Sequence, residues 1–197
     1  MGSSIDISET NLLRQSEELL AELLRDHTTK GNIFWASDNY ESLGEGYGYY
    51  EPITIASITG ERGSIIQPRV FKSRAEQVGR TKDKAEVFTP SWVCNAQNNL
   101  IDEAWFGRRD VFNREHHATR TWTATPGPIV FPEGKTWEDY VRSTRMEITC
   151  GEAPYLVSRY DATTGDFIPI SQRIGMLDRK LRVISENIAS PAEWLSM

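Results

Sequence analysis

The sequence predicts a mixed α/β fold, in which an incomplete doubly wound sheet follows an N-terminal helix and a β-hairpin. Two β-branched runs, 53–58 and 65–71, flank a glycine-containing turn at 59–63 and indicate the hairpin. A short run at 146–150 with β propensity ends at Gly151 and predicts a buried strand of the sheet. We divide the chain into an N-terminal part, 1–79, and a second domain, 80–197.

The amino-acid composition excludes several classes of protein. The 197 residues are 39% hydrophobic, enough to bury a core, and a net charge of −6 argues against a protein that coats nucleic acid nonspecifically. Cys94 and Cys150 form no Cys-x-x-Cys pair, so neither a disulfide framework nor a zinc site is indicated. No apolar run approaches the roughly 20 residues of a membrane span, and no signal peptide is visible. We expect no membrane contact and a cytoplasmic protein.

The N-terminal part begins with an amphipathic pattern. Leucines on one face predict a helix over 7–26, with Asp6 and Glu9 at capping-box spacing and a turn at 28–31. We expect this helix to pack against its own domain; an interface with a partner subunit is the alternative. Aromatic and glycine residues fill 32–52, which we interpret as a packed surface loop, with stacking on nucleic-acid bases as the alternative.

Capping signals also define helices in the second domain. Thr89 can cap a helix with Pro90 at its first position, and Gly107 can end it. Its apolar stripe comprises Trp92, Val93, Ala96, Leu100, Ile101, Ala104 and Trp105. Segment 108–135 lacks periodicity and is interpreted as an insertion. Further helices are predicted after Thr136, from Pro154 toward residue 160, and over 174–188, and 191–197 begins another helical pattern.

Two segments carry the functional signal: Ala85-Glu86-Val87-Phe88-Thr89-Pro90 and Glu147-Ile148-Thr149-Cys150-Gly151-Glu152-Ala153-Pro154-Tyr155. In this order they resemble the two S-adenosylmethionine-binding motifs of adenine-specific DNA methyltransferases, the modification subunits of restriction systems. The resemblance covers roughly residues 70–195. It implies a Rossmann-like methyltransferase sheet, S-adenosylmethionine as the cofactor and DNA as a partner.

The resemblance also implies roles for individual residues. One side of the cofactor would be lined by Phe88, Thr89 and Pro90. The other would be met by the loop of Glu147, Thr149, Cys150, Gly151 and Glu152. Within that loop Gly151 would let the backbone approach closely, and the following helix would offer N–H groups to the cofactor carboxylate. Glu147 would meet the ammonium, and we expect Cys150 to be a small buried residue rather than a nucleophile.

Basic residues precede the first motif. We interpret Arg80, Lys82 and Lys84 as candidates for contact with DNA phosphates, with an ordinary solvated face as the alternative. His116-His117 beside Glu115 lacks a third ligand at metal-binding spacing, and we reject a metal site there. Glu186 falls on a helical pattern and is a poor ribose ligand.

The Asn/Asp-Pro-Pro-Tyr/Phe tetrapeptide that holds the target adenine in this family is absent from the 197 residues. We therefore expect the cofactor-binding N-terminal portion of such an enzyme, inactive in methyl transfer by itself. Its partners would be DNA and a restriction or specificity subunit, or the missing C-terminal part. The alternative is a non-catalytic DNA-binding or protein-interaction module derived from such a subunit.

Overall fold

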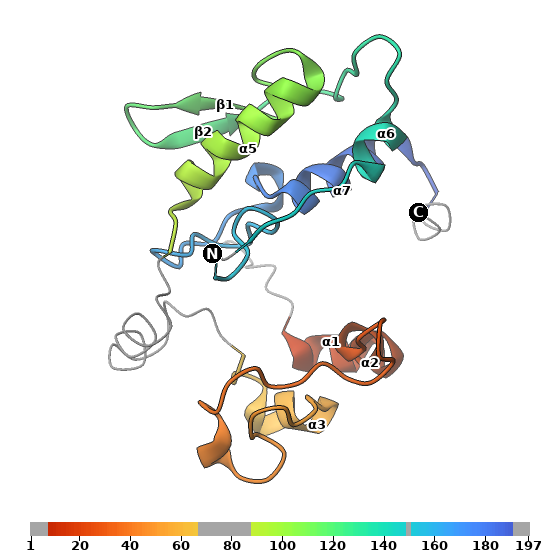
Figure 1. Ribbon diagram of the computed structural model, residues 1–197, viewed down its shortest axis with the longest axis vertical. Helices are drawn as coiled ribbons and strands as arrows, with labels where there is room; N and C mark the ends of the chain where they lie inside the picture. The colour runs from red at the N-terminus through yellow and green to blue at the C-terminus, as the bar shows by residue number, and fades with distance from the viewer. Residues whose placement is uncertain (1–7, 67–87, 149–150, 191–197) are drawn as a thin grey trace. The chain divides into compact units, whose positions relative to one another are not determined.

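The computed structural model describes residues 8–66, 88–148 and 151–190, which belong to two compact units (Figure 1). Unit 1 comprises residues 1–67 and unit 2 residues 68–197. The fold is mixed α/β, with helices in both units and a small antiparallel sheet in unit 2. None of the helices in the described ranges is both long and apolar enough to cross a membrane.

Unit 1 is built from short helices. They are α1 (Glu9–Gln15), α2 (Glu17–Leu24), the 3₁₀ turn η1 (Glu41–Leu43), α3 (Ile55–Ile58) and the 3₁₀ turn η2 (Gly60–Arg62). The single helix predicted over 7–26 is therefore wrong in one respect. Ser16 adopts an extended backbone with φ −163° and its side chain accepts a hydrogen bond from the N–H of Leu19, so it ends one helix and caps the next. The capping residue of α1 is Ser8, whereas Asp6 lies outside the described residues.

The predicted β-hairpin is also wrong in its first half. Residues 55–58 form α3 because Thr54 and Ser57 make a capping box, in which each side chain accepts from the backbone N–H of the other residue. Gly60 then begins η2 with φ +62°, where a strand would need an extended backbone. The second half, from residue 67 on, lies outside the described residues.

Aromatic side chains supply much of the core of unit 1. Its buried members are Leu20, Leu24, Trp35, Tyr47, Ile53 and Ile58. The indole N–H of Trp35 donates to the Gly46 carbonyl at 3.0 Å, and the Tyr47 hydroxyl donates to the Ser57 carbonyl at 3.1 Å. The structure thus confirms that α2 packs against its own unit and that the 32–52 loop is packed, because both contribute to this core.

Unit 2 contains α5 (Ser91–Phe106), β1 (Asn113–His116), β2 (Thr121–Ala124), α6 (Trp137–Arg142), the 3₁₀ turn η4 (Ile170–Gln172) and α7 (Met176–Asn187). The strands β1 and β2 form an antiparallel hairpin in which Asn113 faces Ala124 and His116 faces Thr121 (Figure 1). This hairpin lies in the 108–135 segment, whose sequence shows no periodicity. The predicted helices after Thr136 and over 174–188 are confirmed by α6 and α7, and Gly107 ends α5 with φ +69°.

Two predictions for the second motif are wrong. Residues 146–148 form no strand, and the side chains of Met146 and Ile148 are 82% and 62% exposed. Residues 154–156 form a hydrogen-bonded turn, where the N–H groups of Leu156 and Val157 both donate to the Ala153 carbonyl, and no helix follows. Residues 146–148 have no neighbouring strand to pair with among the described residues, so their β propensity is not used in a sheet.

The burial of α5 is the reverse of the expected pattern. Its predicted apolar stripe is largely outside the core, with Trp92, Leu100 and Ile101 38%, 63% and 44% exposed. The opposite face is buried and mostly polar, comprising Ser91, Cys94, Asn95, Asn98, Asp102 and Phe106. A buried polar face requires hydrogen-bond partners, and several of these come from α7 and β1.

Candidate functional site

The structure brings the two predicted motifs together at one contact. The Phe88 ring lies against Gly151, so that a methyl group on Gly151 would be 3.3 Å from Cε1 of Phe88. Gly151 has φ +67°, a conformation that residues with side chains rarely adopt. Close packing on the ring and the backbone conformation both favour glycine at this position.

The start of α5 differs from the prediction in its details. Pro90 is the N-cap, and Ser91 rather than Pro90 is the first helical residue. The Ser91 N–H donates to Oδ2 of Asp161 at 2.7 Å, and the N–H and hydroxyl groups of Thr163 also donate to Asp161. Burial opposes ionisation of this carboxyl group, but the hydrogen bonds together outweigh burial and lower its pKa. An acid of the chain itself therefore occupies the N-terminus of α5.

Glu147 is likewise bound within the chain. Its carboxylate accepts from the backbone N–H groups of Leu156 at 3.0 Å and Tyr155 at 3.4 Å, and so holds the turn that follows Gly151. The resemblance assigns N–H groups of this segment to the cofactor carboxylate instead. Nearby, burial raises the pKa of Tyr160 to about 12, assisted by the negative charge of Glu152 and a hydrogen bond to it. Both acids of the second motif, Glu147 and Glu152, thus contact groups of the chain itself.

Five of the predicted site residues lie outside the described residues: Thr149, Cys150, Arg80, Lys82 and Lys84. Of the histidine pair, His116 shares a hydrogen bond of 2.8 Å with the Thr123 hydroxyl, and Nδ1 of His117 lies 3.7 Å from a Glu115 carboxylate oxygen. In the ranges that the structure describes, no three His, Cys, Asp or Glu side chains gather closely enough to hold a metal ion.

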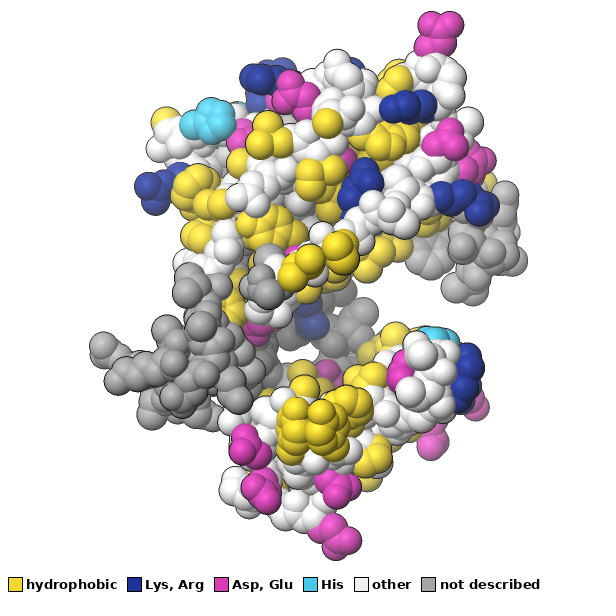
Figure 2. Space-filling model, in the orientation of Figure 1, with side chains coloured by type: hydrophobic (Ala, Val, Ile, Leu, Met, Phe, Trp, Pro, Cys, Tyr) yellow, Lys and Arg dark blue, Asp and Glu magenta, His cyan; other side chains and the backbone are white. Residues whose placement is uncertain are grey.

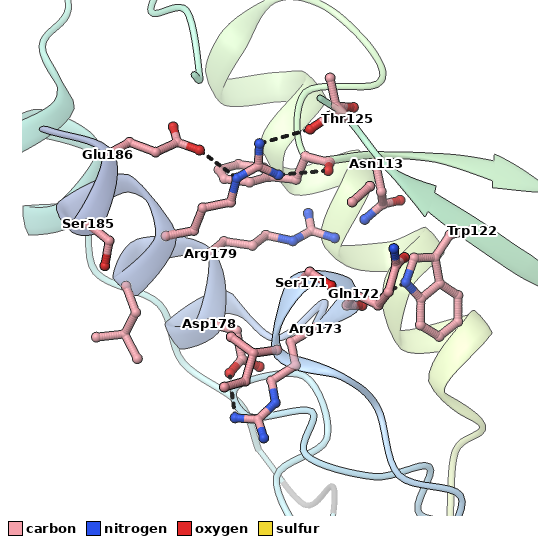
Figure 3. Close-up of a pocket in the computed structure, with 15 residues that line it drawn as sticks. Asn113, Trp122, Thr125, Ser171, Gln172, Arg173, Asp178, Arg179, Ser185 and Glu186 are labelled. Carbon is pink, nitrogen blue, oxygen red and sulfur yellow. Dashed lines mark hydrogen bonds and ion pairs between the residues drawn. The ribbon is translucent and has the colours of Figure 1, made fainter. Parts of the chain in front are cut away.

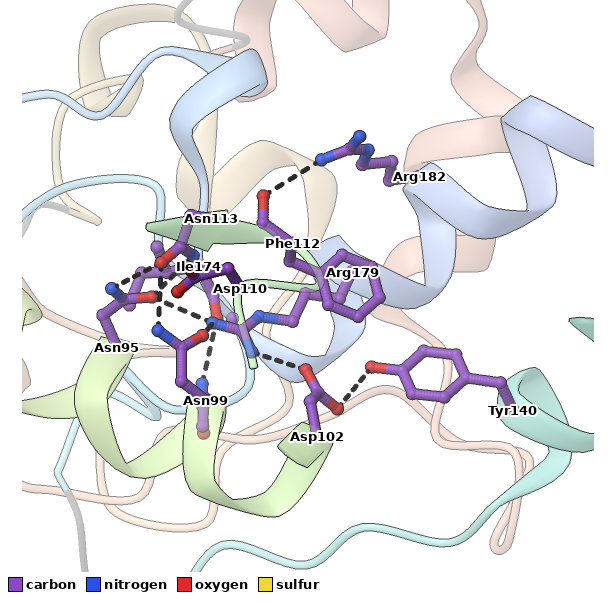
Figure 4. A network of polar contacts seen from close by, with 12 residues as sticks. Asn95, Asn99, Asp102, Asp110, Phe112, Asn113, Tyr140, Ile174, Arg179 and Arg182 are labelled. Carbon is purple, nitrogen blue, oxygen red and sulfur yellow. Dashed lines mark hydrogen bonds and ion pairs between the residues drawn. The ribbon is translucent and has the colours of Figure 1, made fainter. Parts of the chain in front are cut away.

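Sequence reasoning missed a buried polar cluster at the centre of unit 2, which we call the Arg179 cluster (Figure 4). Its members are Asn95, Asn99 and Asp102 on α5, Asn113 on β1, Tyr140 on α6 and Arg179 on α7. The guanidinium of Arg179 donates to the Asp102 carboxylate and to the side-chain carbonyls of Asn95 and Asn99. The signal that could have revealed it is the helical spacing of residues 95, 99 and 102, which places their side chains on one face.

The remaining members add further hydrogen bonds to the cluster, although the buried Nε of Arg179 has no partner among the described residues. Asn113 exchanges two hydrogen bonds with Asn95, at 2.8 and 2.9 Å. The Tyr140 hydroxyl donates to Asp102 at 2.9 Å, and burial together with that negative charge raises the pKa of Tyr140 well above its usual range. Tyr140 therefore remains a neutral donor at physiological pH. Buried charges that are paired and hydrogen-bonded in this way hold elements in a fixed arrangement.

A pocket of about 610 Å³ adjoins the Arg179 cluster (Figure 3). Its apolar lining includes Phe112, Trp122, Ile170 and Leu181. Three arginines also line it, and each has an acidic neighbour: Arg173 with Asp178 at 3.9 Å, Arg182 with Glu186 at 2.7 Å, and Arg179 with Asp102. Because the positive charges are balanced, the pocket suits a largely apolar group with a few hydrogen-bonding atoms better than a highly charged anion.

Glu186 lies on α7, as predicted, and its two carboxylate oxygens accept from Arg182 and from the Ile129 N–H. It lines the pocket and stabilises the fold around it.

No family model matches the chain, and no curated protein and no solved structure matches it either.

Proposed function

We propose that the chain is the S-adenosylmethionine-binding, N-terminal portion of an adenine-specific DNA methyltransferase of a restriction-modification system. One observation carries the proposal: Phe88 of the first motif packs on Gly151 of the second. Motifs that belong to one cofactor site must meet in space, and these two do so although the segment 91–146 separates them in sequence.

The described residues fit this cofactor in part. Bound S-adenosylmethionine would supply an electrophilic methyl group. Phe88 and Gly151 would provide an aromatic wall and a close backbone approach. The N–H donors suited to the cofactor carboxylate are engaged, however, by Asp161 at Ser91 and by Glu147 at Leu156. A ligand carboxylate would have to compete with both acids, so we expect weak binding by this chain alone.

Methyl transfer requires groups that these 197 residues do not contain, since the Asn-Pro-Pro-Tyr tetrapeptide is absent from them. We propose that another segment or subunit supplies that tetrapeptide, and that DNA and a restriction or specificity subunit are the partners of the assembly. The chain alone should transfer no tritium from labelled S-adenosylmethionine to duplex DNA. Transfer above a protein-free blank would contradict this division of roles.

The cofactor assignment is tested by calorimetric titration of the chain with S-adenosylmethionine. Gly151→Val should abolish binding, because the added side chain would collide with the Phe88 ring. The matched control is Gly134→Val. Gly134 has φ +75°, and a methyl group added there would meet no atom within 4 Å, so this variant introduces comparable backbone strain away from the motifs.

Circular dichroism should show that both variants remain folded. Absence of binding by the wild-type chain, or equal affinity of all three proteins, would remove the cofactor from this site.

A second candidate function, a protein-interaction module, is favoured by the exposed apolar face of α5. This face includes Trp92, Leu100 and Ile101. Contiguous apolar surface beyond a few hundred Å² is characteristic of protein-binding sites. The guanidinium of Arg120 lies 5.1 Å from the centre of the Trp92 ring and covers one edge of this surface.

Light scattering at increasing protein concentration, together with binding of a hydrophobic dye, tests this candidate. We expect the chain to associate and to bind dye, and Leu100→Gln with Ile101→Gln to reduce both. Leu23→Gln, at a leucine of unit 1 with 58% exposure, is the control. A compact monomer that binds no dye would show that this face of α5 is not an exposed apolar surface in solution.

A further inference from the structure

Three aromatic side chains of unit 1 point into solvent instead of the core. Phe34, Tyr49 and Tyr50 are 48%, 55% and 63% exposed. The ring centres of Tyr49 and Tyr50 lie 4.1 Å apart, and those of Phe34 and Tyr50 lie 4.9 Å apart. The three rings thus form one continuous exposed surface, which we call the Tyr50 patch.

The backbone beneath the Tyr50 patch is fixed by hydrogen bonds. The Tyr50 N–H donates to the Trp35 carbonyl, and the Trp35 N–H donates to the Glu51 carbonyl, both at 3.0 Å. Trp35 itself is buried in the core of unit 1. Tyr50 has φ +67°, a conformation that is uncommon for an aromatic residue. The backbone that carries the rings is therefore fixed before any partner arrives, which reduces the entropy lost on binding.

The segment that carries the patch is acidic. Segment 32–52 contains Asp38, Glu41, Glu45 and Glu51, all exposed, and no Lys or Arg. Between residues 8 and 66 there are ten Asp or Glu and four Lys or Arg residues, so this part has a formal charge of −6. Figure 2 shows hydrophobic surface with acidic side chains around it on unit 1. The hydrogen bond to Tyr50 raises the pKa of Tyr49, with smaller contributions from the Tyr50 charge, from burial and, least, from the Asp38 carboxylate.

We propose that the Tyr50 patch binds the arginine side chains of a basic segment in a partner protein. Aromatic faces attract cations, and a guanidinium also stacks on them as a flat group. The carboxylates of this segment add attraction for a positive chain and speed its encounter. The same carboxylates repel phosphates, so the charge argues against the stacking of nucleic-acid bases on these rings. Because the patch lies within unit 1, this inference does not depend on the cofactor site.

Fluorescence anisotropy of the full chain with a labelled peptide of alternating arginine and glycine tests the proposal. A peptide with glutamine in place of arginine measures the contribution of charge. The variant Tyr49→Ala with Tyr50→Gly removes two rings, and glycine at position 50 suits the positive φ. We expect about tenfold weaker binding of the arginine peptide to this variant, consistent with cation–π energies for partly exposed rings.

A second variant, Asp38→Asn with Glu51→Gln, should weaken binding at low salt and have a smaller effect at high salt, where charges are screened. The matched controls on α2 are Leu23→Ala, with 58% exposure, and Glu17→Gln with Glu18→Gln. These controls should bind the arginine peptide as the wild type does. Equal binding of the two peptides, equal loss in patch and control variants, or tighter binding of single-stranded DNA than of the arginine peptide would overturn the proposal.

Discussion

Arg179 on α7 forms an ion pair with Asp102 on α5, and at most 2% of either side chain is exposed. The Asp102 carboxylate also accepts from Tyr140 on α6, so one buried acid joins three helices that are distant in sequence (Figure 4). Removal of either charge would leave the other buried without its partner. The pair therefore sets the arrangement of unit 2 more than it adds to stability.

Breaking this pair should be costly. Arg179→Met or Asp102→Asn should each lower the free energy of unfolding by about 3–5 kcal/mol, because an uncompensated polar or charged group stays buried. Urea unfolding followed by tryptophan fluorescence measures this. Arg109→Met is the control, since its ion pair with Glu103 is exposed and worth about 1 kcal/mol or less. A loss below about 1 kcal/mol in both cluster variants would show that the pair is not buried as described.

The hydrogen bonds that Asp161 accepts predict that the stability of the fold depends on pH. The carboxyl pKa is lowered in the folded chain, so Asp161 stabilises the fold at pH values above its ordinary pKa of 3.8, and this contribution is lost as the pH falls through the lowered value. The difference in melting temperature between wild type and Asp161→Asn should be constant from about pH 5 to 7 and shrink below about pH 4. Glu133→Gln, an exposed acid before α6, controls for the loss of one charge. A difference that is the same at all pH values would refute this role.

Substitution of Gly175 by a larger residue should cause a steric clash without backbone strain. Its φ is −64°, which any residue can adopt, but a methyl group there would collide with the Leu156 carbonyl. The carbonyl cannot move freely, because it accepts from the Leu177 N–H at 2.9 Å. Gly175→Ala should destabilise the protein by about 1–3 kcal/mol or more in urea unfolding, as overpacking does. Gly31→Ala, whose methyl group would meet only Thr29 Oγ1 at 3.8 Å, should be tolerated; equal effects would argue against the close approach at Gly175.

Local signals in the sequence predicted the fold most reliably. The capping pair Thr136 and Asp139, the helix end at Gly107 and the 174–188 periodicity all correspond to observed features. Each depends on residues within a few positions of one another, so the sequence contains the whole interaction. The prediction of a strand over 53–58 was wrong for an equally local reason. The capping box of Thr54 and Ser57 outweighed the β propensity of the neighbouring isoleucines.

Long-range relationships were not predictable from one sequence. The amides of Asn95 and Asn99 face the interior because Arg179 reaches them from 80 or more positions away, and nothing near residue 95 indicates that partner. The contact of Phe88 with Gly151 was anticipated only through the family resemblance. The doubly wound sheet remains a prediction, since β1 and β2 are the strands that the described residues form into a sheet.

The reversed burial of α5 has a consequence for how sequences related to this chain should vary. Asn95 and Asp102 touch Arg179 directly, so a change at any of these positions should be accompanied by a change at another. Leu100 and Ile101 face outward and have no such constraint from their own fold. In an alignment of relatives, drift to polar residues at 100 and 101 would mark a solvated surface. Apolar residues retained there would mark a surface that binds another molecule.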